Sequence, residues 1–218
     1  MSPVRAVIFD MDGVLVDSER LHIDAWHVLF AQKGISVSEE TFRNAIGQSD
    51  LSFLEELFAA RGLRDEVIPW LLEKKVIFDR ILRERGRLFP GARELVAALQ
   101  GKYRLAVASS SWRGSVQIAL ETLGLIELFD DFVGKDDVTR HKPDPEVYLL
   151  AARRLDALPA ECVAIEDSLY GIDAALAAGM RCIGVAHSLP AGRIRRADLV
   201  VDSLRDKEAI LAFLNHSS

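Results

Sequence analysis

Short, continuously apolar runs constrain the fold of this chain more than any other feature of its sequence. Five runs of strand length are bounded by turn residues, at 4–9, 104–108, 162–165, 182–186 and 199–201. Continuous hydrophobicity without polar alternation is typical of strands that are buried on both faces of a parallel sheet. Between the runs lie helical patterns, at 92–99, 115–123, 146–155 and 169–178. Strands that alternate with helices predict an α/β fold with a doubly wound, Rossmann-like parallel sheet.

The segment 17–86 interrupts this alternation. It contains consecutive helical patterns, at 18–33, 39–46, 51–61 and 66–85, and Ser36 and Glu39 have the spacing of a capping box. A helical block inserted after the first strand predicts a separate helical-bundle cap at 17–86 and a core made of 1–16 and 87–218. Short hinges are expected near 14–17 and 86–90, and we expect the cap to close over the core by motion at these hinges.

Composition narrows the class of protein. Of the 218 residues, 50% are hydrophobic and 28% are charged, which supports a sizeable core and excludes disordered or collagen-like chains. The net charge of −6 disfavours nucleic acid as a partner, and no apolar stretch is long enough to span a bilayer. Cys162 and Cys182 lie inside apolar runs, as buried thiols of a reducing compartment do. We therefore expect a cytoplasmic monomer that binds neither nucleic acid nor membranes and has no signal peptide.

Carboxylates follow two of the apolar runs. Asp10 and Asp12 come directly after the first run, and Glu166 and Asp167 follow the third. The carboxyl ends of parallel strands meet at one edge of a sheet, where ligands bind. Four carboxylates gathered there would repel one another, and they would either raise their pKa values or require a cation. A hard ion with oxygen ligands, Mg²⁺, fits this requirement.

Two further polar positions complete the pattern. Ser109 ends the second run, at the start of Ser109-Ser110-Ser111, and Lys142 precedes two prolines that fix the path of the chain into a helix. Each position taken alone has an ordinary explanation, as a helix-capping serine or as a solvated lysine. Taken with the carboxylates, they provide a nucleophile, an acid, a metal site and a cation for developing charge. This combination is typical of phosphoryl transfer.

The four motifs stand in the order Asp10-Met11-Asp12-Gly13-Val14, Ser109, Lys142-Pro143 and Glu166-Asp167. With the helical insert between the first two, the whole chain resembles the haloacid dehalogenase superfamily of aspartate-nucleophile phosphotransferases. It is most similar to the branch that holds β-phosphoglucomutase and small sugar-phosphate phosphatases.

This resemblance implies a role for each motif residue. Asp10 would be the nucleophile that becomes an aspartyl-phosphate. Asp12 would protonate the leaving oxygen and then activate water, while Ser109 and Lys142 would hold the phosphoryl group. Mg²⁺ would be bound by Asp10, the backbone carbonyl of Asp12, and Asp167. Glu166 would support the metal through water or from its outer shell.

The cap is expected to select the substrate. His22 and Trp26 lie one turn apart on the first cap helix, in positions that resemble substrate-facing residues of the mutase, although half-buried packing is the ordinary role of such residues. Gly47 in the cap and Ser110 in the core are further candidate substrate-binding residues.

Asp50 stands where the mutase cap presents an arginine to the substrate's second phosphate, and we interpret Asp50 as the N-cap of the helix at 51–61. Lys74 or Lys75 is the alternative cation for the cleft, although the ordinary role of a lysine pair on a helix is a solvated face.

Without that arginine, hydrolysis is favoured over isomerisation. We therefore expect an Mg²⁺-dependent phosphatase that acts on a small phosphorylated metabolite, a sugar phosphate, through an aspartyl-phosphate. The alternative is a mutase of the β-phosphoglucomutase type. A phosphonatase would need a cap lysine that forms a Schiff base. A non-catalytic binder of phosphorylated metabolites would be expected to have a broken motif set, and the four motifs here are intact.

Overall fold

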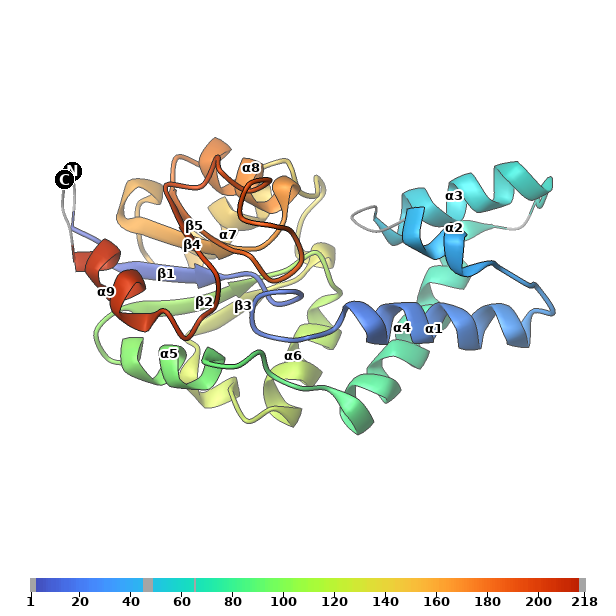
Figure 1. Cartoon of the computed structure of the whole chain (residues 1–218), viewed down its shortest axis with the longest axis horizontal. Coiled ribbons are helices and arrows are strands. Elements are labelled where there is room, and N and C mark those ends of the chain that lie inside the picture. Colours follow the sequence, from blue (N-terminus) through green and yellow to red (C-terminus); the bar gives the residue numbers. More distant parts are fainter. Residues whose placement is uncertain (1–2, 45–48, 65, 216–218) are drawn as a thin grey trace. The chain divides into compact units, whose positions relative to one another are not determined.

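Six strands of the described residues form one parallel sheet. The computed structural model describes residues 3–44, 49–64 and 66–215. The strands are β1 (Ala6–Phe9), β2 (Arg104–Ala108), β3 (Asp131–Val133), β4 (Cys162–Glu166), β5 (Arg181–Val185) and β6 (Leu199–Val201), in the order β3-β2-β1-β4-β5-β6. All neighbours pair in parallel. The predicted doubly wound parallel sheet with a helical insert is confirmed (Figure 1).

The sheet is buried because its central strands present apolar side chains to both faces. Every residue of β1 is fully buried, and β4 is buried along its whole length. Helices α5 (Ala92–Leu99) and α6 (Arg113–Thr122) lie on one side of the sheet, and α7 (Glu146–Arg154) and α8 (Leu169–Ala177) lie on the other (Figure 1). Burial of each large apolar side chain contributes about 1.5–3 kcal/mol. Cys162 and Cys182 are buried free thiols, as expected.

The chain divides into two compact units. One comprises Met1–Ser18 with Gly86–Ser218 and contains the sheet, and the other is Glu19–Arg85. The second unit, which we call the cap unit, contains four helices within the described residues: α1 (Glu19–Gln32), α2 (Glu39–Asn44), α3 (Asp50–Arg61) and α4 (Val67–Arg85). That this unit acts as a cap stays a prediction.

Strand β3 and helix α9 (Lys207–Asn215) of the core unit were not predicted from the sequence. Strand β3 has only three residues and lies at the edge of the sheet, where two of its side chains are half-buried. Helix α9 follows β6, and short 3₁₀ turns occur at Ile126–Leu128, Lys135–Asp137 and Pro159–Glu161. None of the helices in the described residues is both long and apolar enough to cross a membrane.

The predicted capping box at Ser36 and Glu39 is wrong. The hydroxyl of Ser38 accepts the hydrogen bond from the backbone N–H of Thr41, at 3.2 Å. Helix α2 begins at Glu39, so Ser38 immediately precedes it and occupies the capping position.

Candidate active site

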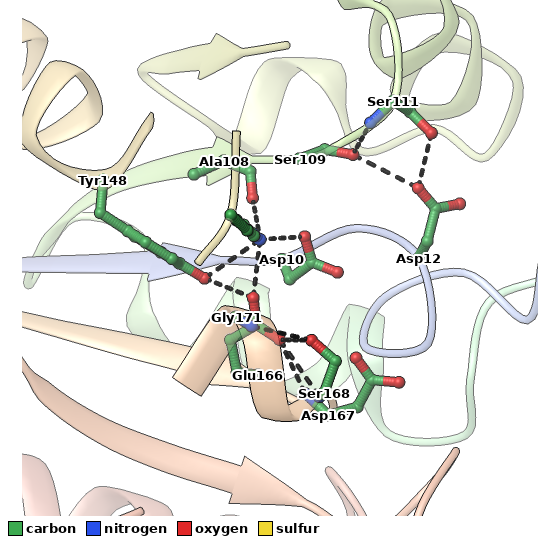
Figure 2. Close-up of polar contacts among 11 residues, drawn as sticks. Asp10, Asp12, Ala108, Ser109, Ser111, Tyr148, Glu166, Asp167, Ser168 and Gly171 are labelled. Carbon is green, nitrogen blue, oxygen red and sulfur yellow. Dashed lines mark hydrogen bonds and ion pairs between the residues drawn. The ribbon is translucent and has the colours of Figure 1, made fainter. Parts of the chain in front are cut away.

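The carboxyl ends of β1, β2 and β4 bring the predicted core residues together. Phe9 of β1 pairs with Val107 of β2 on one side and with Ile165 of β4 on the other. Asp10 therefore follows β1 beside the end of each neighbouring strand, and its backbone N–H donates to the carbonyl of Ile165 at 2.9 Å. Figure 2 shows the resulting group of side chains at this edge of the sheet.

Lys142 is the cation at the centre of this group. Its ammonium donates to Asp10 Oδ1 at 2.7 Å, to Glu166 Oε1 at 2.6 Å and to the carbonyl oxygen of Ala108 at 3.0 Å. Burial works to lower the pKa of Lys142, but the two carboxylates outweigh it and raise that pKa above its ordinary value. Lys142 is therefore held as a charged group by several hydrogen bonds. The sequence alone could not distinguish it from a solvated lysine.

Glu166 is held by hydrogen bonds at both carboxylate oxygens. Oε1 accepts from Lys142 and from the hydroxyl of Tyr148, the latter at 2.7 Å. Oε2 accepts from the backbone N–H groups of Asp167 and Ser168, at 3.1 and 3.3 Å, and from the Ser168 hydroxyl at 3.1 Å. Helix α8 begins directly beside it, since a Cβ on Gly171 would lie 1.8 Å from Glu166 Oε1. These contacts fix Glu166 in one orientation (Figure 2).

The acidic groups carry more negative charge than Lys142 can balance. Burial raises the pKa of Asp10 well above its usual value, against the opposing effect of Lys142. Burial, reinforced by the neighbouring Glu166, raises the pKa of Asp167 to about 7. Buried carboxylates with raised pKa values of this kind would be stabilised in their charged form by a bound cation.

The donor set fits a hard divalent cation. Asp10, Glu166 and Asp167 are all buried and offer carboxylate oxygens that lie within 4.8 Å of one another. Both oxygens of Glu166 already accept hydrogen bonds from protein groups, so Asp10 and Asp167 are the residues with carboxylate oxygens available to hold an ion directly. Oxygen donors of this kind, few in number, are those Mg²⁺ takes when waters and a phosphate complete its coordination.

Asp12 lies half-buried beside the cluster and is held by hydroxyl groups. Ser18 donates to its Oδ1 at 2.5 Å, and Ser111 and Ser109 donate to its Oδ2 at 2.8 and 3.3 Å. The turn after Asp12 requires Gly13, whose φ is +82° and whose Cβ, if present, would lie 2.0 Å from Asp167 Oδ2. The turn thus places Asp12 and Asp167 in the same site.

Several of these residues were not singled out from the sequence. They are Ser18, Ser111, Tyr148, Ser168 and Ser188, the last bonded to the Asp167 side chain. Ser111 had a signal, because it belongs to the serine run after β2. Tyr148 had none, since only the packing of α7 against the sheet brings its hydroxyl to Glu166.

The cap residues His22, Trp26 and Asp50 form a cluster with Lys74 inside the cap unit. Lys74 Nζ lies 2.7 Å from Asp50 Oδ2 and 2.7 Å from His22 Nδ1, and the Trp26 indole N–H donates to Asp50 Oδ1 at 3.2 Å. The ring of His22 stacks on Phe78, with centroids 4.0 Å apart. Gly47 lies outside the described residues, and Ser110 is exposed beside the buried Ser109.

Two expectations about this cluster are wrong. Ser49 is the N-cap of α3, because its hydroxyl accepts from the N–H of Ser52, and Asp50 is the first residue of the helix. Lys74 is only 2% exposed, so it is not part of a solvated face. The ion pair with Asp50 and the cation–π contacts with Trp26 and Phe78 explain how this lysine is accommodated.

Comparisons with known proteins match this architecture. Residues 4–179 match the family model of haloacid dehalogenase-like hydrolases. A phosphorylated carbohydrates phosphatase of Thermotoga maritima is 37% identical over 196 residues, which cover 87% of this chain and 89% of the relative. A β-phosphoglucomutase of Bacillus subtilis is 33% identical over 213 residues, covering 93% and 91%. Among solved structures, CbbY of Rhodobacter sphaeroides in complex with xylulose-(1,5)bisphosphate has a TM-score of 0.82 at 28% identity, over 92% of this chain and 95% of that one.

Proposed function

Because this chain belongs to the haloacid dehalogenase-like hydrolase family, as a phosphatase of its β-phosphoglucomutase and sugar-phosphate phosphatase branch, we propose that it hydrolyses a phosphorylated sugar, with Mg²⁺, through an aspartyl-phosphate on Asp10. The observation that carries this proposal is the buried group of Asp10, Glu166 and Asp167 around Lys142, with Asp12 beside it. A relative that acts on phosphorylated carbohydrates supports the substrate class.

In the first step, an oxygen of Asp10 attacks phosphorus and the bond from phosphorus to the sugar oxygen breaks. Oδ1 of Asp10 is hydrogen-bonded to Lys142, and the other oxygen turns toward the side of Asp12 and Asp167 (Figure 2). Asp12 gives its proton to the departing sugar oxygen. Lys142 and Ser109 hold the phosphoryl oxygens, and Mg²⁺, when held by Asp10, Asp167 and the Asp12 carbonyl, supplies positive charge for the transferring group.

In the second step, Asp12 acts as a base. Its carboxylate takes a proton from water, the water oxygen attacks phosphorus, and the bond to Asp10 breaks to release phosphate. Three serine hydroxyls hold the Asp12 carboxyl in place for both steps. Ser110, His22 and Gly47 remain our candidates for contacts with the rest of the substrate.

The ion pair within the cap unit supports hydrolysis over isomerisation. A mutase must hold a second phosphate of its bisphosphate intermediate, which requires an available cation. Lys74 is already paired with Asp50 at 2.7 Å, so its positive charge is compensated inside the cap unit. A mutase stays the second candidate because a β-phosphoglucomutase is among the relatives.

Phosphate release tests this proposal. Hexose, pentose, polyol and nucleoside monophosphates would be incubated with the protein and Mg²⁺, each with an EDTA control, and β-glucose 1-phosphate would also be assayed for conversion to glucose 6-phosphate. We expect metal-dependent phosphate release from a few related sugar phosphates. Isomer formation with little free phosphate would establish the mutase instead.

The Asp10→Asn variant tests the nucleophile. We expect it to lose turnover of every substrate while its circular dichroism spectrum and melting temperature stay close to those of the parent protein. Retained turnover in a folded Asp10→Asn protein would overturn the assignment of Asp10.

A further inference from the structure

Two chain segments that connect the core unit to the cap unit run beside each other within the core unit. Val16 forms an antiparallel bridge with Leu88. The N–H of Asp17 donates to the carbonyl of Arg87 at 3.0 Å, and the N–H of Phe89 donates to the carbonyl of Leu15 at 2.9 Å. We call residues 15–17 and 87–89 the linker ribbon. It continues directly from the turn that carries Asp12, because Gly13 N–H donates to the Val16 carbonyl at 3.0 Å.

One histidine contacts both the turn and the ribbon. His187 follows β5, and its Nδ1 lies 3.0 Å from the carbonyl oxygen of Gly13. A carbonyl oxygen only accepts, so Nδ1 carries the proton and donates. The same ring stacks on Phe89, with centroids 4.0 Å apart and planes 16° from parallel.

The loop after β5 also limits where the turn can lie. A Cβ on Gly13 would approach the Ser188 hydroxyl to 2.8 Å as well as the Asp167 carboxylate. The side chain of Ser188 is hydrogen-bonded to Asp167. His187 and Ser188 therefore contact the turn at Gly13. Ser18, Ser109 and Ser111 hold the side chain of Asp12 by hydrogen bonds.

We infer that His187 is a positioning residue that couples the linker ribbon, through Phe89, to the turn that carries Asp12, and so keeps Asp12 aligned for proton transfer to the leaving oxygen. This inference rests on the proposed function, because it gives Asp12 the role of acid and base. His187 itself touches neither the carboxylate of Asp12 nor the Lys142 group among the contacts of the described residues; it acts through Gly13.

Leaving groups of different basicity reveal such a role. A sugar alkoxide is a poor leaving group and needs the proton of Asp12, whereas p-nitrophenolate leaves without one. Because both substrates share the second step, in which Asp12 is the base, the comparison uses kcat/KM, which reports only the steps through formation of the aspartyl-phosphate. A small displacement of Asp12 should therefore lower kcat/KM for the sugar phosphate and change kcat/KM for p-nitrophenyl phosphate little. Simple loss of structure would lower both to the same extent.

Two substitutions separate the two contacts of the ring. His187→Phe keeps an aromatic ring to stack on Phe89 but has no N–H for Gly13, and His187→Asn keeps an N–H donor but loses the stack. We expect His187→Phe to lower kcat/KM for the sugar phosphate about 10-fold, a part of the effect of a general acid, and to leave kcat/KM for p-nitrophenyl phosphate within about 2-fold. The Phe89→Leu substitution removes the other ring of the stack. Its matched control is Phe213→Leu, which changes a half-buried phenylalanine of α9.

A double-mutant cycle tests the coupling. If the stack transmits the position of the ribbon, Phe89→Leu combined with His187→Asn should be no worse than the more damaging single variant. Equal loss with both substrates, or strictly additive effects of the two substitutions, would overturn the inference. If His187→Phe does not fold, His187→Asn and Phe89→Leu give the same ratio test. Failure of the proposed function would show separately, as no phosphate release by the unaltered protein or as retained turnover in Asp10→Asn.

Discussion

At the scale of single residues, the site depends on neutral hydroxyls that satisfy buried charges. Tyr148 is fully buried, and its hydroxyl donates to Glu166 Oε1 and lies 3.4 Å from Lys142 Nζ. Removal of a hydrogen-bond donor to a buried carboxylate lowers the free energy of unfolding more than removal of an exposed hydrogen bond does. The carboxylate stays buried but has one hydrogen bond fewer.

The Tyr148→Phe substitution should therefore destabilise the protein. It removes a single oxygen atom and keeps the ring that packs beside Lys142, so we expect the free energy of unfolding to fall by about 1–3 kcal/mol. Urea denaturation of the metal-free protein would measure it. Tyr103→Phe is the matched control, because the Tyr103 hydroxyl donates to Asn215 at an exposed position. An equal effect of both substitutions would contradict the assigned role of Tyr148.

The sequence predicted the charged residues of the site better than the residues that support them. Carboxylates at the ends of buried apolar runs are costly unless they are used, so Asp10, Glu166 and Asp167 are conspicuous. Tyr148 and Lys74 are not, because nothing near them in the sequence identifies their partners. The fold supplies the acidic partner of Lys74, because Asp50 comes from another helix.

At the scale of elements, strands buried on both faces could be predicted and marginal elements could not. Residues 104–108 were predicted as a strand and form β2, since each of its last four residues is buried. Strand β3 lies at the edge of the sheet and pairs with β2. It has only three residues, so its apolar run is too short to be recognised in the sequence. The sequence also does not fix the ends of helices. Ser36 and Ser38 are both suitable N-cap residues, and the position at which α2 begins decides between them.

The start of α8 limits what side chain can stand at residue 171. The Gly171→Ala substitution would place a Cβ within 2.2 Å of both carboxylate oxygens of Glu166, so helix or carboxylate must move. We expect metal-dependent turnover to fall at least about 10-fold, since misplacement of a buried charged group near the reacting atoms is expensive. Gly192→Ala, where the nearest atoms lie 3.8 Å or more away, is the control and should behave as the unaltered protein in the phosphate-release assay.

Helices α3 and α4 are held together by the Asp50–Lys74 pair. The Asp50→Ala substitution leaves the Lys74 ammonium buried without its carboxylate, and we expect it to lower the stability of the cap unit by about 3 kcal/mol. Urea unfolding followed by the fluorescence of Trp26 and Trp70, both buried in this unit, reports the change. Removal of the exposed pair of Lys33 and Glu73 by Glu73→Ala should cost less than about 1 kcal/mol. Equal losses would show that the Asp50–Lys74 pair is energetically an ordinary surface pair.

At the scale of the whole molecule, the crowded carboxylates make stability depend on pH and metal. A carboxyl whose pKa is higher in the folded than in the unfolded state binds its proton more tightly when folded. The pKa of Asp167 is raised from 3.8 to about 7, and that of Asp10 is raised in the same direction. The contribution of Asp167 to stability is therefore present at low pH and is lost as pH rises from about 4 through about 7, and that of Asp10 is likewise lost as pH rises.

Metal-free protein should accordingly melt at a higher temperature at about pH 5.5 than at about pH 8. Addition of Mg²⁺ at about pH 8 should restore much of the difference, because an ion that binds only the folded state stabilises it. Scanning calorimetry with EDTA and with Mg²⁺ would measure both effects. A melting temperature that rises with pH in EDTA, or that does not change when Mg²⁺ is added, would contradict the assignment of this cluster as a cation site.

The position of β1 in the middle of the sheet also governs when activity can arise during biosynthesis. β1 is translated before the other strands, yet its two neighbours, β2 and β4, begin at Arg104 and Cys162. At about 5–20 residues per second, the ribosome needs on the order of 10 s to supply β4 after β1 has emerged. Until then Asp10 does not have Asp167 beside it. Under the proposed function, the nascent chain therefore cannot hydrolyse phosphate esters before the segment that carries Asp167 has been synthesised.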